Sequence, residues 1–336
     1  MVHIILPEEQ TATKAALKGQ TRRLSFYLAM EEFVAKELRQ FDECFFAWQV
    51  EPTVIFGRNQ LIQSEVNIKY CQEHHIDMIR RKSGGGCVYA DMSNIMFSYI
   101  NTGWNVTLTF EHYINMVADM LRSLGVDATT SSRNDIMIDG RKVSGNAFYH
   151  IPGRNIVHGT MLYDTDMQNM LNAITPDAGK LQSKGVESVR QHICLLKDYI
   201  GHKMDINQFR QYACREMCDT EYLLTPGDIE KIEEIQQEYH DPNYILGHNP
   251  AYEIKRHLRI EGVGDFVVNI NLKNNVVKNI NILGDFFLIG DINELLAAFT
   301  QVPYTTAAIK DIAQKLSPSQ VVMGLTPENL VKLLID

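Results

Sequence analysis

Hydrophobic residues recur every three or four positions along two long segments of the chain, and this spacing predicts amphipathic helices. In the first segment, residues 24–38, Glu31 and Glu32 stand between the apolar positions. The second segment, residues 110–124, ends at Gly125, where a helix stop is expected. The same spacing predicts shorter helices over residues 166–174, 206–217, 229–239, 292–299, 306–316 and 327–334.

Runs of apolar residues bounded by turn residues predict strands in the first half of the chain. They cover residues 44–50, 53–56, 76–79, 88–89, 94–100 and 155–163. The clearest local signal is Asp139-Gly140 between apolar-rich flanks. This pair favours a type I′ hairpin turn, because both central residues need positive φ. Lys142 is therefore expected at the start of the return strand.

Residues 240–250 contain two prolines, a glycine and several polar residues, and they are interpreted as a linker. This interpretation divides the chain into residues 1–245 and residues 251–336. Beyond the linker, residues 251–283 alternate like two or three strands, with a hairpin turn expected at residues 271–275. Because helices follow these strands, the second part is predicted to be a small α+β domain.

Composition narrows the classes of function. A chain of 336 residues with 45% hydrophobic residues exceeds the usual size of a single core. Its formal net charge of −9 argues against non-specific nucleic-acid binding, and it has no apolar run long enough to span a membrane. Six scattered cysteines are typical of reduced thiols. The sequence therefore predicts a cytoplasmic protein with no nucleic-acid or membrane partner.

Residues 80–86, with the sequence RRKSGGG, join two predicted strands. Three consecutive glycines allow a ligand close to the backbone and expose amide donors. The neighbouring arginines and lysine suit a phosphate or carboxylate, so the segment indicates an anion-binding loop. It is neither a P-loop nor a dinucleotide-binding fingerprint. The alternative is a glycine-rich hairpin with solvated charges.

The hairpin at residues 134–147 is the second candidate element. A lysine held on a rigid hairpin, such as Lys142, can act as a point charge on phosphate oxygens. Asp135 can hold a magnesium ion that takes its other ligands from phosphate. The alternative is an exposed lysine beside a turn. Cys87 follows the glycines, but nothing in the sequence marks it as an activated nucleophile.

Together these segments resemble the lipoate–protein ligase family of the biotin/lipoate ligase superfamily. The resemblance is carried by motifs between residues 20 and 200, and a chain of spaced motifs is more specific than any one of them. The motifs are Trp48 with TVIFGRNQ at 53–60, RRKSGGGCVYAD at 80–91, NDIMIDGRKVSGNAFY at 134–149, HGTMLY at 158–163 and KLQSKGVESVR at 180–190. The C-terminal third agrees only in length and strand–helix order.

The resemblance implies an α+β fold, with a large mixed-sheet catalytic domain and a small C-terminal α+β domain. It implies that ATP, with Mg²⁺, activates lipoic acid to lipoyl-AMP, and that the lipoyl group passes to a lysine of a carrier domain. The expected carriers are acyltransferase subunits of 2-oxoacid dehydrogenases and the glycine-cleavage H protein. For a eukaryotic source, the mitochondrion is the alternative location.

The resemblance also assigns roles to individual residues. Lys142 is the expected catalytic residue and contacts both substrates. The other residues expected to bind ATP are Arg81, Gly86, Cys87, Val88 and Tyr89. Those expected to bind lipoate are Arg80, Ser83, Gly84, Gly85, Ala147 and His158, although a structural role for His158 is an equal alternative. Asp135 is the expected magnesium ligand, with Asn134 beside it. A basic rim at the mouth of the site is expected from Arg80, Arg81, Lys82, Arg133 and Arg141.

Three other functions remain open from the sequence. An ATP-independent lipoyl or octanoyl transferase is the first alternative, although such enzymes commonly lack the C-terminal domain or use a cysteine nucleophile. A biotin ligase fits less well, because its glycine–arginine loop differs. A non-enzymatic relative that only binds carrier domains is disfavoured because Lys142 is present.

Overall fold

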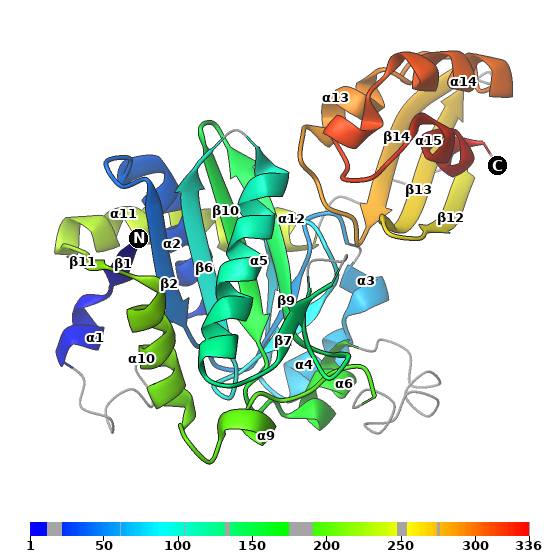
Figure 1. The fold of residues 1–336 in the computed structure, drawn as a ribbon. Coiled ribbons are helices and arrows are strands. Elements are labelled where there is room, and N and C mark those ends of the chain that lie inside the picture. Colours follow the sequence, from blue (N-terminus) through cyan, green and yellow to red (C-terminus); the bar gives the residue numbers. More distant parts are fainter. Residues whose placement is uncertain are drawn as a thin grey trace.

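The structure, a computed structural model, describes residues 1–11, 22–60, 62–103, 105–131, 135–174, 191–246, 254–273 and 276–335. It contains a large N-terminal unit and a small C-terminal unit, which lies at the upper right in Figure 1. None of the helices in the described ranges is long and apolar enough to cross a membrane.

An eight-stranded mixed sheet forms the centre of the larger unit (Figure 1). Strand β1 runs parallel to both of its neighbours, and every other adjacent pair in this sheet is antiparallel. In spatial order the strands are β11 (Thr220–Leu223), β1 (Val2–Ile5), β2 (Glu43–Trp48), β6 (Ile95–Thr102), β10 (Arg154–Met161), β9 (Arg141–Ile151), β8 (Asp135–Ile138) and β7 (Ala128–Thr130).

Helices cover both faces of this sheet (Figure 1). The helices α5 (Val106–Ser123) and α10 (Ile206–Met217) pack into one apolar core, and α2 (Leu24–Glu37) and α11 (Pro226–Gln236) pack into another. Helix α2 is therefore enclosed between the sheet and α11, and twelve of its fourteen residues are buried. The expected helix is present, but its expected amphipathic character is wrong, because Glu31 and Glu32 are buried like its apolar residues.

A second, three-stranded sheet carries the glycine segment. Strand β3 (Thr53–Phe56) pairs in parallel with β4 (Asp77–Arg80) and antiparallel with β5 (Val88–Ala90). The segment with the three glycines, residues 81–87, joins β4 to β5, and we call it the glycine loop. Helices α3 (Ile62–Glu65), α4 (Ile68–Glu73) and α6 (Met167–Ile174) pack beside this sheet around a small apolar core.

The C-terminal unit is an antiparallel three-stranded sheet with helices on one side, which confirms the expected α+β class. It has an apolar core of its own. Its elements are β12 (Ile254–Ile260), β13 (Gly264–Lys273), β14 (Val276–Gly284), α13 (Ile292–Ala297), α14 (Thr306–Lys315) and α15 (Pro327–Leu334).

The linker predicted at residues 240–250 is wrong in part. A 3₁₀ turn, η1 (Gln237–His240), leads into a short helix, α12 (Pro242–Leu246), so ordered structure continues where a linker was expected. The proline suits the first turn of a helix, where its missing N–H costs nothing. Residues 247–253 lie outside the described residues.

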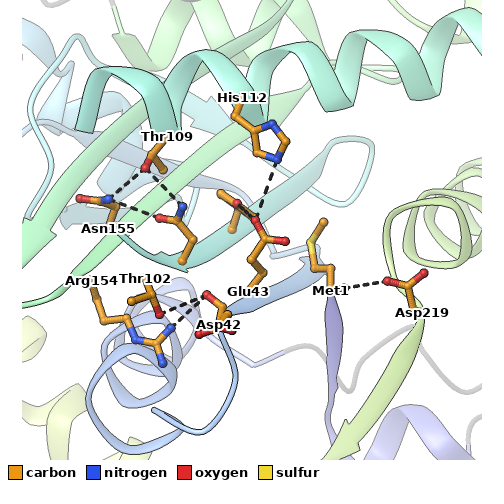
Figure 2. Close-up of polar contacts among 11 residues, drawn as sticks. Met1, Asp42, Glu43, Thr102, Thr109, His112, Arg154, Asn155 and Asp219 are labelled. Carbon is orange, nitrogen blue, oxygen red and sulfur yellow. Dashed lines mark hydrogen bonds and ion pairs between the residues drawn. The ribbon is translucent and has the colours of Figure 1, made fainter. Parts of the chain in front are cut away.

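Polar contacts fasten α5 to the middle of the large sheet (Figure 2). The side-chain amide of Asn155, at the start of β10, donates to Thr109 Oγ1 at 3.0 Å and to Asn101 Oδ1 at 3.3 Å. The guanidinium of Arg154 donates to the carbonyl of Asp42 at 3.2 Å. These hydrogen bonds satisfy buried polar groups and fix the entry of β10, the strand that carries His158.

Candidate active site

A cavity of about 480 Å³ lies where the glycine loop, the β8–β9 hairpin, β10 and the C-terminal unit meet. Apolar side chains of the larger unit line part of it, namely those of Leu28, Trp48, Ile55, Val88, Met96 and Ala147. The charged residues in its lining are Arg81, Asp135, Lys142, Arg259 and Asp285. A mainly apolar cavity with a few charged groups is typical of a small-molecule site.

The β8–β9 hairpin positions Lys142. Asp139 and Gly140 have φ of 50° and 71°, which confirms the predicted turn. A register shift next to Ile136 and Met137 leaves one extra residue on the β9 side, and such bulges redirect side chains. The Lys142 ammonium lies 2.8 Å from a carboxylate oxygen of Asp135. Both groups line the cavity and are partly exposed, so they are accessible to a ligand.

Two features of the surrounding backbone position Lys142. The backbone N–H of Lys142 donates to the carbonyl of His192, and its carbonyl accepts from the N–H of Cys194. A Cβ atom on Gly145 would lie 2.7 Å from the end of the lysine side chain, so the glycine leaves the space that this side chain occupies. Hydrogen bonds with His192 and Cys194 therefore fix the backbone of Lys142, and Gly145 makes room for its side chain.

Arg81 shapes the glycine loop from inside. Its guanidinium donates to Ser83 Oγ at 2.9 Å and to the carbonyls of Ile55, Gly84 and Gly86 at 3.0, 2.6 and 2.7 Å. Only 4% of the residue is exposed, and burial lowers the pKa of Arg81 to about 10. The guanidinium therefore stays charged at neutral pH, and of its five donors three bind the loop and a fourth binds Ile55 in β3.

Arg80 points away from the cavity. Its guanidinium donates to the carbonyls of Tyr244 and Ile245 in α12, and to three carbonyls in the segment after β3, those of Gly57, Arg58 and Gln60. It also lies over the ring of Phe56, 4.6 Å from the ring centroid. These contacts join two segments of the chain, and none of them faces the cavity.

A buried network of side-chain hydrogen bonds links His158 to the glycine loop. Because the Glu31 carboxylate accepts, His158 Nδ1 carries a proton and donates to it at 2.9 Å. His158 Nε2 shares a 2.7 Å hydrogen bond with Ser83 Oγ, which also accepts from Arg81 Nε at 2.9 Å. Glu31 also accepts from Ser98 at 2.6 Å. Ser83 is fully buried, so its hydroxyl belongs to this hydrogen-bond network and does not reach the cavity.

The expected site residues separate into two groups. Those that line the cavity are Arg81, Gly85, Gly86, Cys87, Val88, Asp135, Lys142, Ala147 and His158. Those that do not line it are Arg80, Ser83, Gly84 and Tyr89. Asn134, Arg133 and the motif at residues 180–190 lie outside the described residues. The expected basic rim is wrong for Arg80 and Arg81, which are buried, and Lys82 is paired with Glu32 and Glu238.

The sequence did not reveal two sets of cavity residues. The first comes from α2, where Leu28 lines the cavity and Glu31 orients His158. The second comes from the C-terminal unit, chiefly Arg259, Asp285 and Phe287. An acidic residue within the apolar stretch of α2 was the available signal for Glu31. No local signal distinguishes the residues of the second set.

Cys87 lines the cavity, yet its surroundings do not activate it. Burial raises the pKa of the Cys87 thiol well above its ordinary value. The thiolate is the nucleophilic form, so little of it is present at neutral pH. For the activity that the sequence resemblance implies, we expect Cys87→Ser to retain a rate within about threefold of the unaltered protein, because a neutral thiol is a poor nucleophile. The measurement is lipoylation of a carrier protein; a loss of more than a hundredfold would favour the alternative of a cysteine-dependent transferase.

Comparison with known proteins identifies the family. Residues 24–218 match the catalytic domain of the lipoyl protein ligase A/B family, and residues 249–334 match the bacterial lipoate protein ligase C-terminus. The lipoate-protein ligase LplJ of Bacillus subtilis is 31% identical to this chain over 316 residues, which cover 91% of this chain and 95% of that protein.

Solved structures agree with the fold. The crystal structure of Plasmodium falciparum LipL1 in complex with lipoate superposes with a TM-score of 0.77 at 20% identity, and covers 98% of this chain and 97% of that one. The crystal structure of lipoate-protein ligase A bound with ATP has a TM-score of 0.57 at 24% identity, over 66% of this chain and 94% of that one. The family match over residues 24–218 thus makes the larger unit a lipoyl-ligase-type catalytic domain. The chain belongs to the lipoyl protein ligase A/B family, and its enzyme class is that of the lipoate–protein ligases.

Proposed function

We propose that this ligase works in two steps within the cavity described above. In the first, the carboxylate of lipoate attacks the α-phosphate of ATP, which forms lipoyl-AMP and releases pyrophosphate. In the second, a lysine amine of a carrier domain attacks the lipoyl carbonyl, which forms an amide and releases AMP. The supporting observation is that one cavity combines the Lys142–Asp135 pair with a set of apolar side chains.

The lining suits both parts of the substrate. Burial of an apolar acyl tail against Leu28, Trp48 and Met96 is favourable, because it removes the tail from water. The Lys142 ammonium supplies positive charge for the α-phosphate, where negative charge builds up during phosphoryl transfer. Lys142 would have to exchange part of its contact with Asp135 for the phosphate. Partial exposure of both side chains permits this exchange.

Asp135 fits a magnesium ion that is shared with the nucleotide. Among the described residues no cluster of three His, Cys, Asp or Glu side chains could hold a metal, so an all-protein site is absent from that part of the chain. Magnesium needs no such cage, because it commonly takes one or two carboxylates and completes its shell with phosphate oxygens and water. The metal would neutralise charge on the phosphates, and Asp135 would hold it near Lys142.

The carriers that we propose are the lipoyl domains of 2-oxoacid dehydrogenase acyltransferase subunits and the glycine-cleavage H protein. The decisive experiment measures pyrophosphate release with ATP, magnesium and lipoate, first without a carrier and then with one. Release that depends on lipoate is the expected result. Acyl transfer from a lipoylated donor protein without ATP would instead establish the transferase function.

A variant of Asp135 tests the proposed metal ligand. We expect Asp135→Asn to raise the magnesium concentration for half-maximal pyrophosphate release by about tenfold, because the ion loses its carboxylate. Asp139→Asn is the matched control, since Asp139 lies at the exposed turn of the same hairpin and contacts Tyr199. An unchanged magnesium requirement in Asp135→Asn would remove Asp135 from the metal site.

A further inference from the structure

Specific contacts hold the C-terminal unit against the glycine loop and the segment after β3. The N–H of Gly284 donates to the carbonyl of Asn59 at 2.6 Å, and the N–H of Gly85 donates to the carbonyl of Phe286 at 3.0 Å. A Cβ atom on Gly84 would lie 2.2 Å from that carbonyl oxygen, so the approach requires glycine. These contacts set the end of β12 and the following turn, residues 259–264, against the cavity.

An aromatic contact reinforces this arrangement. The ring of Phe287 stacks on that of Phe148 in β9, with centroids 5.7 Å apart and planes 13° apart. Phe287 also packs against the core between the large sheet and α5. Backbone hydrogen bonds and a stacked ring pair are contacts of a well-packed interface. They hold the residues of the C-terminal unit that line the cavity in place.

Charge in the cavity singles out Arg259. The described lining contains three cationic side chains, Arg81, Lys142 and Arg259, and two carboxylates, Asp135 and Asp285. Without Arg259 their formal charges cancel, so the other side chains of the described lining supply no net positive charge for a polyanion such as ATP.

The three cations differ in how far they are already engaged. Arg81 is committed to the glycine loop, and Lys142 is paired with Asp135. The Arg259 guanidinium is exposed and has no hydrogen bond or ion pair with any residue that the structure describes. Its planar fork therefore keeps all five donors for phosphate oxygens.

We propose that Arg259 binds the β- and γ-phosphates of ATP, so that the C-terminal unit forms part of the nucleotide site. This inference rests on the proposed function, in which Lys142 serves the α-phosphate. Arginine is suited to the outer phosphates because it offers parallel N–H groups to two oxygens at once. By mass action, a ligand held by both units also stabilises their contact.

The alternative is an ordinary solvated arginine, and β12 provides the matched control. Lys255 lies four residues before Arg259 on the same strand, so both side chains lie on the same face. Both residues are exposed, but only Arg259 lines the cavity. Arg259→Gln and Lys255→Gln thus remove the same charge from the same strand face, one at the cavity and one outside it.

The test compares direct binding of ATP–magnesium and AMP, measured by calorimetry without lipoate. We expect Arg259→Gln to weaken ATP binding by roughly tenfold or more, because a charge-assisted contact is lost. AMP has no β- or γ-phosphate, so its affinity should change less than twofold. Arg259→Lys should recover part of the loss, and Lys255→Gln should bind ATP like the unaltered protein.

Two results would overturn the assignment. The first is ATP affinity in Arg259→Gln equal to that of Lys255→Gln. The second is an equal loss for ATP and AMP, which would show that the guanidinium does not distinguish the outer phosphates. Failure of the proposed function is separate and visible in the unaltered protein, which would then release no pyrophosphate with ATP and lipoate.

Discussion

Replacing Lys142 by leucine is expected to lower lipoate-dependent pyrophosphate release by about a thousandfold. The ammonium is the cation beside Asp135 in the cavity, and removal of one preorganised electrostatic donor commonly costs a factor of this size. Transfer from presynthesised lipoyl-AMP to a carrier should also slow, because in the proposed mechanism the same ammonium contacts the lipoyl carbonyl.

The fold should survive this substitution. Asp135 loses a partner but remains partly exposed, so the expected loss of stability is at most about 1 kcal/mol. Lys197→Leu is a matched control, because Lys197 is exposed, pairs with Asp164 and lies outside the cavity lining. Rates are compared by a coupled pyrophosphate assay, and folding by circular dichroism. Full activity in Lys142→Leu would refute the assigned role.

Elements with strong local signals were predictable from the sequence. The β8–β9 turn depends on Asp139 and Gly140, whose positive φ values are a property of those two residues. The helix at Ile206–Met217 has the expected bounds, and a capping box at Asp205 explains where it begins. The C-terminal unit also follows the expected order, in which two or three strands precede three helices; the structure has three strands.

Features that depend on tertiary packing were not predictable. Strands β1 and β11 are four residues long and pair only with each other and with β2, so no local turn marks them. From the sequence alone Glu31 is expected on the polar side of a helix, but α11 and the sheet enclose α2 in the structure. Its burial is compensated by His158 and Ser98, which lie far away in the sequence.

The candidate site shows the same division. Lys142, Asp135 and the glycine loop come from short motifs, and the structure brings their cavity-facing members together. Arg259 belongs to an alternating strand in which Lys255 has the same pattern, and only the docking of the C-terminal unit separates the two. The motif RRKSGGG likewise cannot indicate which arginine faces the cavity, since adjacent residues on an extended chain point in opposite directions.

Arg80 carries the largest expected effect on stability. Its guanidinium serves five backbone carbonyls, in the segment after β3 and in α12, and only 6% of the residue is exposed. We expect Arg80→Met to lower the free energy of unfolding by about 3 kcal/mol, because a methionine of similar length can donate to none of these carbonyls. Urea unfolding followed by circular dichroism measures the change.

Arg39→Met is the control, because Arg39 is exposed and also donates to two carbonyls, those of Lys36 and Pro152. Its expected cost is below about 0.5 kcal/mol. Lipoate affinity of Arg80→Met is then measured below its unfolding transition. If Arg80 is structural, the folded variant binds lipoate like the unaltered protein. A variant as stable as Arg39→Met that has lost lipoate binding would instead make Arg80 the ligand that the motif implies. The guanidinium would then have to leave its five carbonyls when lipoate binds.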